Sequence, residues 1–101
     1  MYTKEYQLIN SYNINYLLNY DQFITELNAM VENNKKILQF LIMGDDYLTF
    51  DSHFTNEKKA IAKKEYTANT KSDNVYNWLA QNSNEKAKSV LVYKIFTYDY
   101  N

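Results

Sequence analysis

The segment SVLVYKIFTYDY, residues 89–100, constrains the fold more than any other stretch of the chain. Successive side chains of an extended strand point to opposite faces. Both faces of this segment carry apolar side chains: Leu91, Tyr93 and Ile95 on one, and Val90, Val92, Phe96 and Tyr98 on the other. A strand that is apolar on both faces is typical of the centre of a sheet. We therefore predict a central strand here, with partial cover on its second face.

An amphipathic helix is predicted over residues 20–33. Its apolar side chains follow the i, i+3, i+4, i+7 spacing of one helical face: Tyr20, Phe23, Ile24, Leu27, Met30 and Val31. Asn19 can cap this helix, with Gln22 in the capping-box position. The segment Ile37–Met43 is a short apolar run that predicts a strand.

Two further helices are predicted in the second half of the chain. Residues 55–68 are rich in Lys, Ala and Glu, and Thr55 or Asn56 can cap them. A second helix is expected from Ser72 or Asp73 to about Gln81. It should bury three apolar side chains: Val75, Trp78 and Leu79.

Residues 2–18 fit two patterns. Tyr12, Ile14 and Tyr16 alternate with asparagines as in a strand, whereas Tyr2, Tyr6 and Ile9 fit a helix. We favour a short strand or an extended arm. The whole chain of 101 residues is then a single globular α+β domain: a small antiparallel sheet of three or four strands with two or three helices on one face.

Three acids and the only histidine of the chain lie close together in sequence: Asp45, Asp46, Asp51 and His53. Such carboxylate and imidazole groups suit a divalent metal or a metal-dependent nuclease site. Gly44 and Asp45, however, are followed by Tyr47–Phe50, and glycine at the first central position of a two-residue loop is typical of a type II′ hairpin. We favour a hairpin with an acidic tip and expect no metal.

Composition argues against most enzyme classes. The chain has no cysteine, one histidine and one glycine. Disulfides and thiolate catalysis are excluded, and a phosphate loop or dinucleotide fingerprint needs more glycines. We therefore expect neither enzymatic activity nor a cofactor. The N-terminus has no apolar leader and no apolar run could cross a bilayer, so we expect a cytoplasmic protein that does not bind membranes.

A nucleic-acid-binding surface is the first alternative function. Lys58, Lys59 and Lys63 would span about 140° of the helix expected over residues 55–68 and could face phosphates. Glu57 and Glu65 balance these charges. The chain has no arginine, which argues against a reader of nucleic-acid sequence, although an AT-rich genome would also favour lysine. Direct nucleic-acid binding is therefore the less favoured interpretation.

Eleven tyrosines are more than a small core can hide, and exposed tyrosine is frequent at protein interfaces. In size, composition and α+β layout, though in no motif, the chain resembles the anti-CRISPR and related anti-defence inhibitors of phages and mobile elements in low-GC bacteria. The resemblance implies direct binding to a host protein, such as a defence nuclease whose nucleic-acid groove is blocked. We expect the partner surface among the tyrosines and acids at two places: Asp45, Asp46, Tyr47 and Asp51, and Tyr98, Asp99 and Tyr100. A homo-oligomeric structural protein of a phage or plasmid, such as a homodimer, is the remaining alternative.

Overall fold

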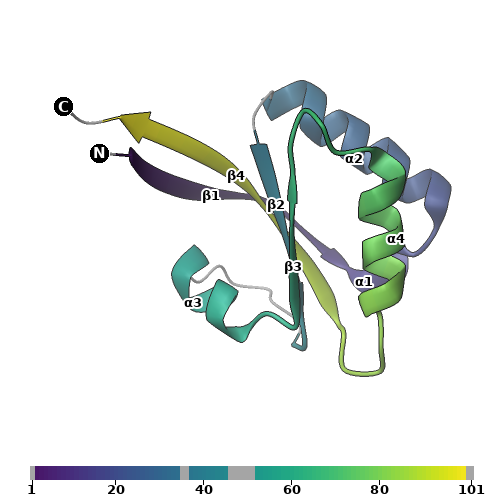
Figure 1. Cartoon of the computed structure of the whole chain (residues 1–101). Coiled ribbons are helices and arrows are strands. Elements are labelled where there is room, and N and C mark those ends of the chain that lie inside the picture. The colour runs from purple at the N-terminus through teal and green to yellow at the C-terminus, as the bar shows by residue number, and fades with distance from the viewer. Residues whose placement is uncertain (1, 35–36, 46–51, 100–101) are drawn as a thin grey trace.

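A four-stranded antiparallel sheet forms the centre of the protein (Figure 1). The structure, a computed structural model, describes residues 2–34, 37–45 and 52–99. The strands are β1 (Tyr2–Asn13), β2 (Ile37–Met43), β3 (Ala62–Tyr66) and β4 (Ser89–Asp99), in the order β1-β4-β2-β3. The helices are α1 (Ile14–Leu17), α2 (Tyr20–Asn34), α3 (His53–Lys59) and α4 (Ser72–Asn82). The expected α+β class and the sheet are confirmed.

The central position of β4 is confirmed as well. It lies between β1 and β2, and Ile95 pairs with Tyr6 on one side and with Ile37 on the other. Val90 and Val92 belong to the core beneath α1, α2 and α4. Leu91 and Tyr93 pack in a second cluster on the opposite face, whose partly buried members include Ala60, the residue after α3. The apolar pattern on both faces therefore has a structural reason: helices cover both sides of this strand.

The two long helices form much as their patterns predict. Asn19 caps α2, because its side-chain oxygen accepts a hydrogen bond from the backbone N–H of Gln22 at 3.1 Å. Helix α2 buries Phe23, Leu27 and Met30, and α4 buries Val75 and Leu79. Trp78 is only half-buried, and its ring meets the Phe40 ring edge-on at 6.5 Å between centroids. Trp78 therefore packs against the core as expected, but only in part, since it lies at the margin of the core.

The helix expected over residues 55–68 is wrong beyond Lys59. Ala60 has extended backbone angles, and Ile61 N–H then donates to Ile42 O at 2.7 Å, just ahead of β3. Strand β3 occupies the edge of β2 that β4 leaves open. Lys, Ala and Glu are good helix formers, but hydrogen bonding along this edge outweighs their helix propensity, which is small in energy. Helix α3 is capped by Ser52, whose Oγ accepts from Thr55 N–H at 3.3 Å, and not by Thr55 or Asn56.

The N-terminal segment is a longer strand than expected, followed by a helical turn. Asn13 ends β1 and caps α1, because its side chain accepts from the N–H of Asn15 at 2.9 Å. Ile14 and Leu17 are buried from this turn. The alternation of Tyr12, Ile14 and Tyr16 therefore does not mark a continuous strand.

The hairpin expected at Gly44 and Asp45 cannot be followed to its end, since residues 46–51 lie outside the described residues. Strand β2 already pairs with β3 and β4 on its two edges over Leu38–Ile42. Its neighbours in the sheet are thus distant in sequence. In the described part of the chain, no helix is long and apolar enough to cross a membrane.

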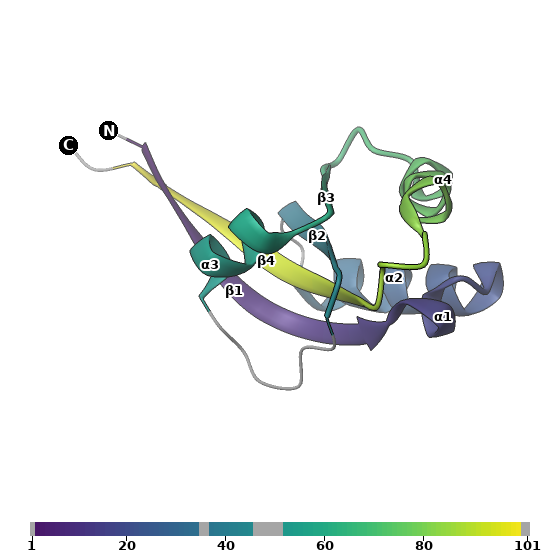
Figure 2. The ribbon, with the colours of Figure 1, turned by 90° about the horizontal axis from the view of Figure 1, so that it is seen from below.

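Strands β1 and β4 extend beyond the rest of the sheet. The last pair between β2 and β4 joins Ile37 to Ile95, whereas β1 and β4 continue to pair as far as Tyr2 and Asp99. The two strands therefore project together as a ribbon from the helical body, with both ends of the chain near its tip (Figures 1 and 2). This ribbon positions the candidate site.

Candidate functional site

The described members of the two groups expected to bind a partner lie at opposite ends of β4. Asp45 is exposed beside the start of β4, where its carbonyl accepts a hydrogen bond from the Ser89 hydroxyl. Tyr98 and Asp99 are exposed at the other end. Ten residue steps along the strand lead from Ser89 to Asp99, roughly 33 Å. Asp45 therefore does not share a surface with Tyr98 and Asp99. Asp46, Tyr47, Asp51 and Tyr100 lie outside the described residues.

The three lysines expected on one helical face are divided between two elements. Lys58 and Lys59 end α3, whereas Lys63 lies on β3. The Lys63 ammonium donates to the Glu57 carboxylate at 2.6 Å, an interaction that raises the pKa of Lys63 and lowers that of Glu57. The Lys58 ammonium lies 4.1 Å from the centre of the Phe54 ring. Two of the three lysines are thus engaged within the protein, and the expected helical face does not exist.

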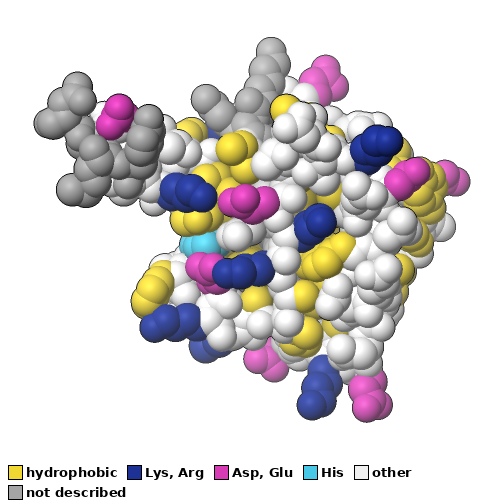
Figure 3. Space-filling view, in the orientation of Figure 1, with side chains coloured by type: hydrophobic (Ala, Val, Ile, Leu, Met, Phe, Trp, Pro, Cys, Tyr) yellow, Lys and Arg dark blue, Asp and Glu magenta, His cyan; other side chains and the backbone are white. Residues whose placement is uncertain are grey.

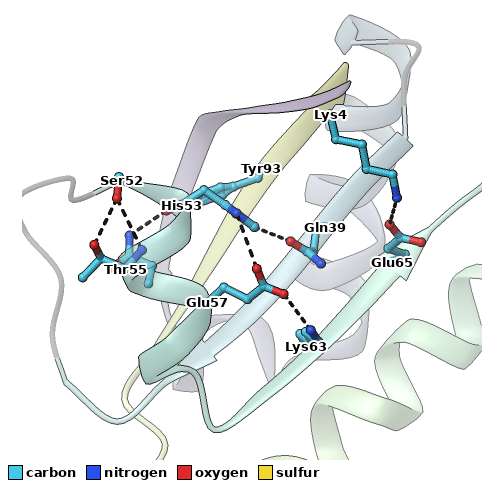
Figure 4. A network of polar contacts seen from close by, with 10 residues as sticks. Lys4, Gln39, Ser52, His53, Thr55, Glu57, Lys63, Glu65 and Tyr93 are labelled. Atoms are coloured by element: carbon cyan, nitrogen blue, oxygen red, sulfur yellow. Dashed lines mark hydrogen bonds and ion pairs between the residues drawn. The ribbon is translucent and has the colours of Figure 1, made fainter. Parts of the chain in front are cut away.

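His53, the first residue of α3, packs on the sheet face that α3 covers (Figure 4). Its ring stacks on Tyr6 with 3.6 Å between centroids and meets Tyr93 edge-on at 4.6 Å. Its Nε2 contacts Gln39 Oε1, and because an amide oxygen only accepts, this contact is a hydrogen bond in the tautomer that has the proton on Nε2. Burial lowers the pKa of His53, and the nearby Glu57 carboxylate opposes this shift only in part.

This environment makes His53 an anchor for α3. Only 7% of its side chain is exposed. One turn further along α3, the buried Asn56 donates through Nδ2 to the Tyr93 hydroxyl at 2.6 Å. No group of three His, Cys, Asp or Glu side chains that could hold a metal is found among the described residues. The contacts of His53 and Asn56 thus attach α3 to β1, β2 and β4.

The surface beside His53 is a polar pocket lined by three lysines and two glutamates. The space-filling view shows basic and acidic side chains next to one another around the single histidine (Figure 3). The pocket measures about 570 Å³ and is lined by Lys4, Tyr6, Gln39, Glu57, Lys63, Lys64 and Glu65. Lys63 pairs with Glu57, and Lys4 lies 3.8 Å from the Glu65 carboxylate. Four of the five charged side chains in the lining thus pair with one another, which weakens the selection of a strongly charged ligand.

Several tyrosines hold surface elements together. The hydroxyls of Tyr12 and Tyr16 donate to the two carboxylate oxygens of Glu26 at 2.8 and 3.1 Å. Burial together with this carboxylate raises the pKa of Tyr12, and the hydrogen bond to Glu26 raises that of Tyr16. The hydroxyl of Tyr20 donates to Asp73 and joins α2 to α4. These tyrosines therefore have structural roles. The number of tyrosines in the sequence alone overestimates how many are available for a protein interface.

The strongest candidate for a binding site is an apolar groove at the base of the ribbon. It measures about 770 Å³. Its lining comes from α2, β2, β3 with the two residues that follow it, and β4: Val31, Glu32, Ile37, Tyr66, Thr67, Ala68, Ile95, Phe96, Thr97 and Tyr98. Ile37 and Tyr98 are 40% and 39% exposed, high values for large hydrophobic side chains.

Of the residues expected to bind a partner that the structure describes, only Tyr98 lines this groove. The sequence analysis placed Val31 on the apolar face of a helix and Ile37 in an apolar strand, and assigned neither to a binding site. One feature of the sequence could have indicated the groove: β4 stays apolar beyond Ile95. Phe96 and Tyr98 continue there the strand face that packs under the helices. No protein-family model, curated protein or solved structure matches the chain.

Proposed function

We propose that this protein is a small binding protein that inhibits a partner protein by direct contact through the apolar groove and the adjoining end of the ribbon. The observation that carries the proposal is the pair of exposed side chains, Ile37 and Tyr98, in a groove with mostly apolar lining. Exposed apolar patches with a defined shape commonly mark protein-binding sites on soluble proteins.

The position of the groove also favours a protein partner. It opens where the ribbon leaves the helical body, so a partner can contact the groove and the ribbon together. Tyr98 contributes an aromatic ring with a polar hydroxyl, a side chain that is common at the centres of interfaces. Asp99 follows it on the ribbon and adds a negative charge. This chemistry suits a partner surface that combines apolar and basic side chains.

For the identity of the partner, we propose a nucleic-acid-handling defence enzyme of a bacterial host. Support comes from the resemblance of the chain to anti-defence inhibitors in size, composition and α+β layout. The acid and tyrosine at the ribbon tip fit the basic surfaces that such enzymes present to nucleic acid. The role of Asp45, Asp46, Tyr47 and Asp51 as a second contact remains part of this proposal.

The test is a pull-down from the lysate of a low-GC bacterium that carries defence systems, with identification by mass spectrometry. Ile37→Asp places a charge in the groove, and Ile61→Asp is a matched control because Ile61 is also 40% exposed but does not line the groove. We expect Ile37→Asp to lose the captured protein and Ile61→Asp to retain it. Capture that is unchanged by Ile37→Asp would refute the groove as the binding site.

The same variants separate partner binding from self-assembly. If light scattering shows an oligomer of the purified protein that Ile37→Asp dissociates, the groove serves contacts between copies of the chain. If the purified protein is a monomer that loses its captured partner on the same substitution, the groove serves the partner. Circular dichroism of both variants establishes that the fold is intact.

A further inference from the structure

Helices α1, α2 and α4 form a layer whose charged side chains are all acidic. The three helices contain no lysine or arginine and four acids: Asp21, Glu26, Glu32 and Asp73. Helix α3, with Lys58 and Lys59 at its end, packs on the opposite face of the sheet (Figure 2). The helical layer is therefore negative, although the net charge of the whole chain is only −1.

Three of these carboxylates have no cation beside them. In the part of the chain that the structure describes, Asp21, Glu26 and Asp73 form no ion pair. Lys71, the exposed residue before α4, is the nearest lysine to Asp73 in sequence and does not pair with it. The end of α2 at Asn34, after which residues 35–36 follow, is roughly 20 Å from Asp21. Unpaired carboxylates on one surface attract a basic partner and repel nucleic acid.

Two exposed tyrosine rings accompany these carboxylates. Tyr16 and Tyr20 are 43% and 46% exposed, although their hydroxyls are fixed on Glu26 and Asp73. A ring that is held in this way loses little conformational freedom on binding, and its face attracts a cation. Six residues separate Tyr20 from Glu26, so the two tyrosine–carboxylate pairs lie about 120° apart around α2. Each pair offers a ring and a carboxylate together to one basic side chain.

One of the two pairs belongs to a small pocket. The pocket measures about 180 Å³ and is lined by Tyr16, Asp21, Gln22, Thr25 and Glu26. The hydroxyls of Tyr12 and Tyr16 occupy one acceptor position on each oxygen of Glu26, and a carboxylate has roughly four such positions. Glu26 can therefore accept further hydrogen bonds from an ammonium or guanidinium group. Asp21 adds a second negative charge to the pocket.

We infer that this helical surface binds a basic segment of a partner protein. One lysine or arginine of the segment enters the pocket of Tyr16, Asp21 and Glu26, and a second lies beside Tyr20 and Asp73. We call these five residues the tyrosine–acid surface. The pocket lies in the N-terminal half of α2, whereas the apolar groove is lined by two residues of its last turn. The inference therefore adds a contact that does not depend on the proposed groove.

The first test titrates deca-arginine into the isotope-labelled full-length protein and follows the backbone amides by NMR, with deca-glutamate as the control peptide. We expect deca-arginine to shift the amides of residues 16–26 and 72–74, and the shifts to weaken as salt is added. Deca-glutamate should leave these amides unchanged. Absence of binding, or shifts spread equally over acids elsewhere such as Glu5 and Glu85, would overturn the inference.

The second test compares matched variants in the same titration. Asp21→Asn with Asp73→Asn removes two charges from the surface, and Glu5→Gln with Glu85→Gln removes two exposed charges elsewhere. We expect the first double variant to bind deca-arginine about tenfold more weakly and the second less than about twofold. Tyr16→Leu should bind about threefold more weakly than Tyr16→Phe, because only phenylalanine keeps the ring face. Equal weakening by both double variants would show a dependence on net charge alone and contradict a defined surface.

The same measurements separate this inference from the proposed function. Ile37→Asp should leave the shifts at residues 16–26 unchanged, because Ile37 lines the groove and not the pocket. If deca-arginine instead shifts the amides of Val31 and Ile37, the peptide binds in the groove, and this inference fails while the groove stands. Light scattering at low salt tests the other occupant. Self-association that Asp21→Asn with Asp73→Asn abolishes would identify a second copy of the chain and overturn the assignment to a partner.

Discussion

Replacement of His53 by alanine should detach α3 from the sheet. The substitution removes two ring contacts, one stacked on Tyr6 and one edge-on to Tyr93, each worth roughly 0.5–1.5 kcal/mol. It also removes the hydrogen bond to Gln39, a side chain that is only 6% exposed, at a further cost of about 1 kcal/mol. We expect the free energy of unfolding to fall by roughly 2–4 kcal/mol, the sum of these contributions.

Urea denaturation followed by far-ultraviolet circular dichroism measures this change. The matched control is Phe54→Ala, at the next residue of α3. Phe54 is 66% exposed, and its loss removes only the contact with the Lys58 ammonium, so stability should fall by no more than about 1 kcal/mol. Hydrogen exchange should show that His53→Ala lowers the protection of the α3 amides before that of β4. If His53→Ala costs no more than Phe54→Ala, then His53 does not anchor α3, and its burial against Tyr6 and Tyr93 needs another explanation.

Three further predictions concern titration, packing and metals. Burial lowers the pKa of His53 below its usual 6.5, so the unfolded chain binds more protons than the folded one. The contribution of His53 to stability should therefore be full above pH 6.5 and decline as the pH falls toward the folded pKa. Urea titrations should show this dependence of the unfolding free energy on pH in the wild type and not in His53→Gln. Leu79→Ala should cost roughly 2–5 kcal/mol because Leu79 is fully buried, and Trp78→Ala should cost less than a fully buried tryptophan would, with thermal melts as the measurement. Melts with and without EDTA should coincide, and a drop of several degrees with the chelator would restore the metal hypothesis for Asp45, Asp46, Asp51 and His53.

The parts of the fold that sequence predicts are those with dense local patterns. Strand β4 has apolar side chains on both faces, and each face has its own core cluster. Helix α2 combines an apolar stripe with a cap at Asn19. In these segments the periodicity of the side chains and the surrounding structure favour the same conformation, so local reasoning is sufficient.

Strand β3 shows where local reasoning fails. The sequence AKKEY at Ala62–Tyr66 consists largely of good helix formers. Its conformation is determined by the free edge of β2. The β2 residues that form this edge lie 20 or more positions earlier in the sequence. Its lysines also suit an edge strand, where charged side chains discourage pairing with other chains. The residues of the segment themselves do not indicate where that edge lies or that its backbone groups are unpaired before β3 adds to it.

The candidate groove follows from strand lengths and not from a motif. Strand β4 has 11 residues and β2 has 7, so the end of β4 extends past β2. Phe96 and Tyr98 lie on this extension, on the face that the helices cover further along the strand. The two rings stack with 6.3 Å between centroids, and Tyr98 is 39% exposed. Exposed aromatic side chains of this kind are frequent at protein interfaces, and they are the reason that the proposed partner site is placed here.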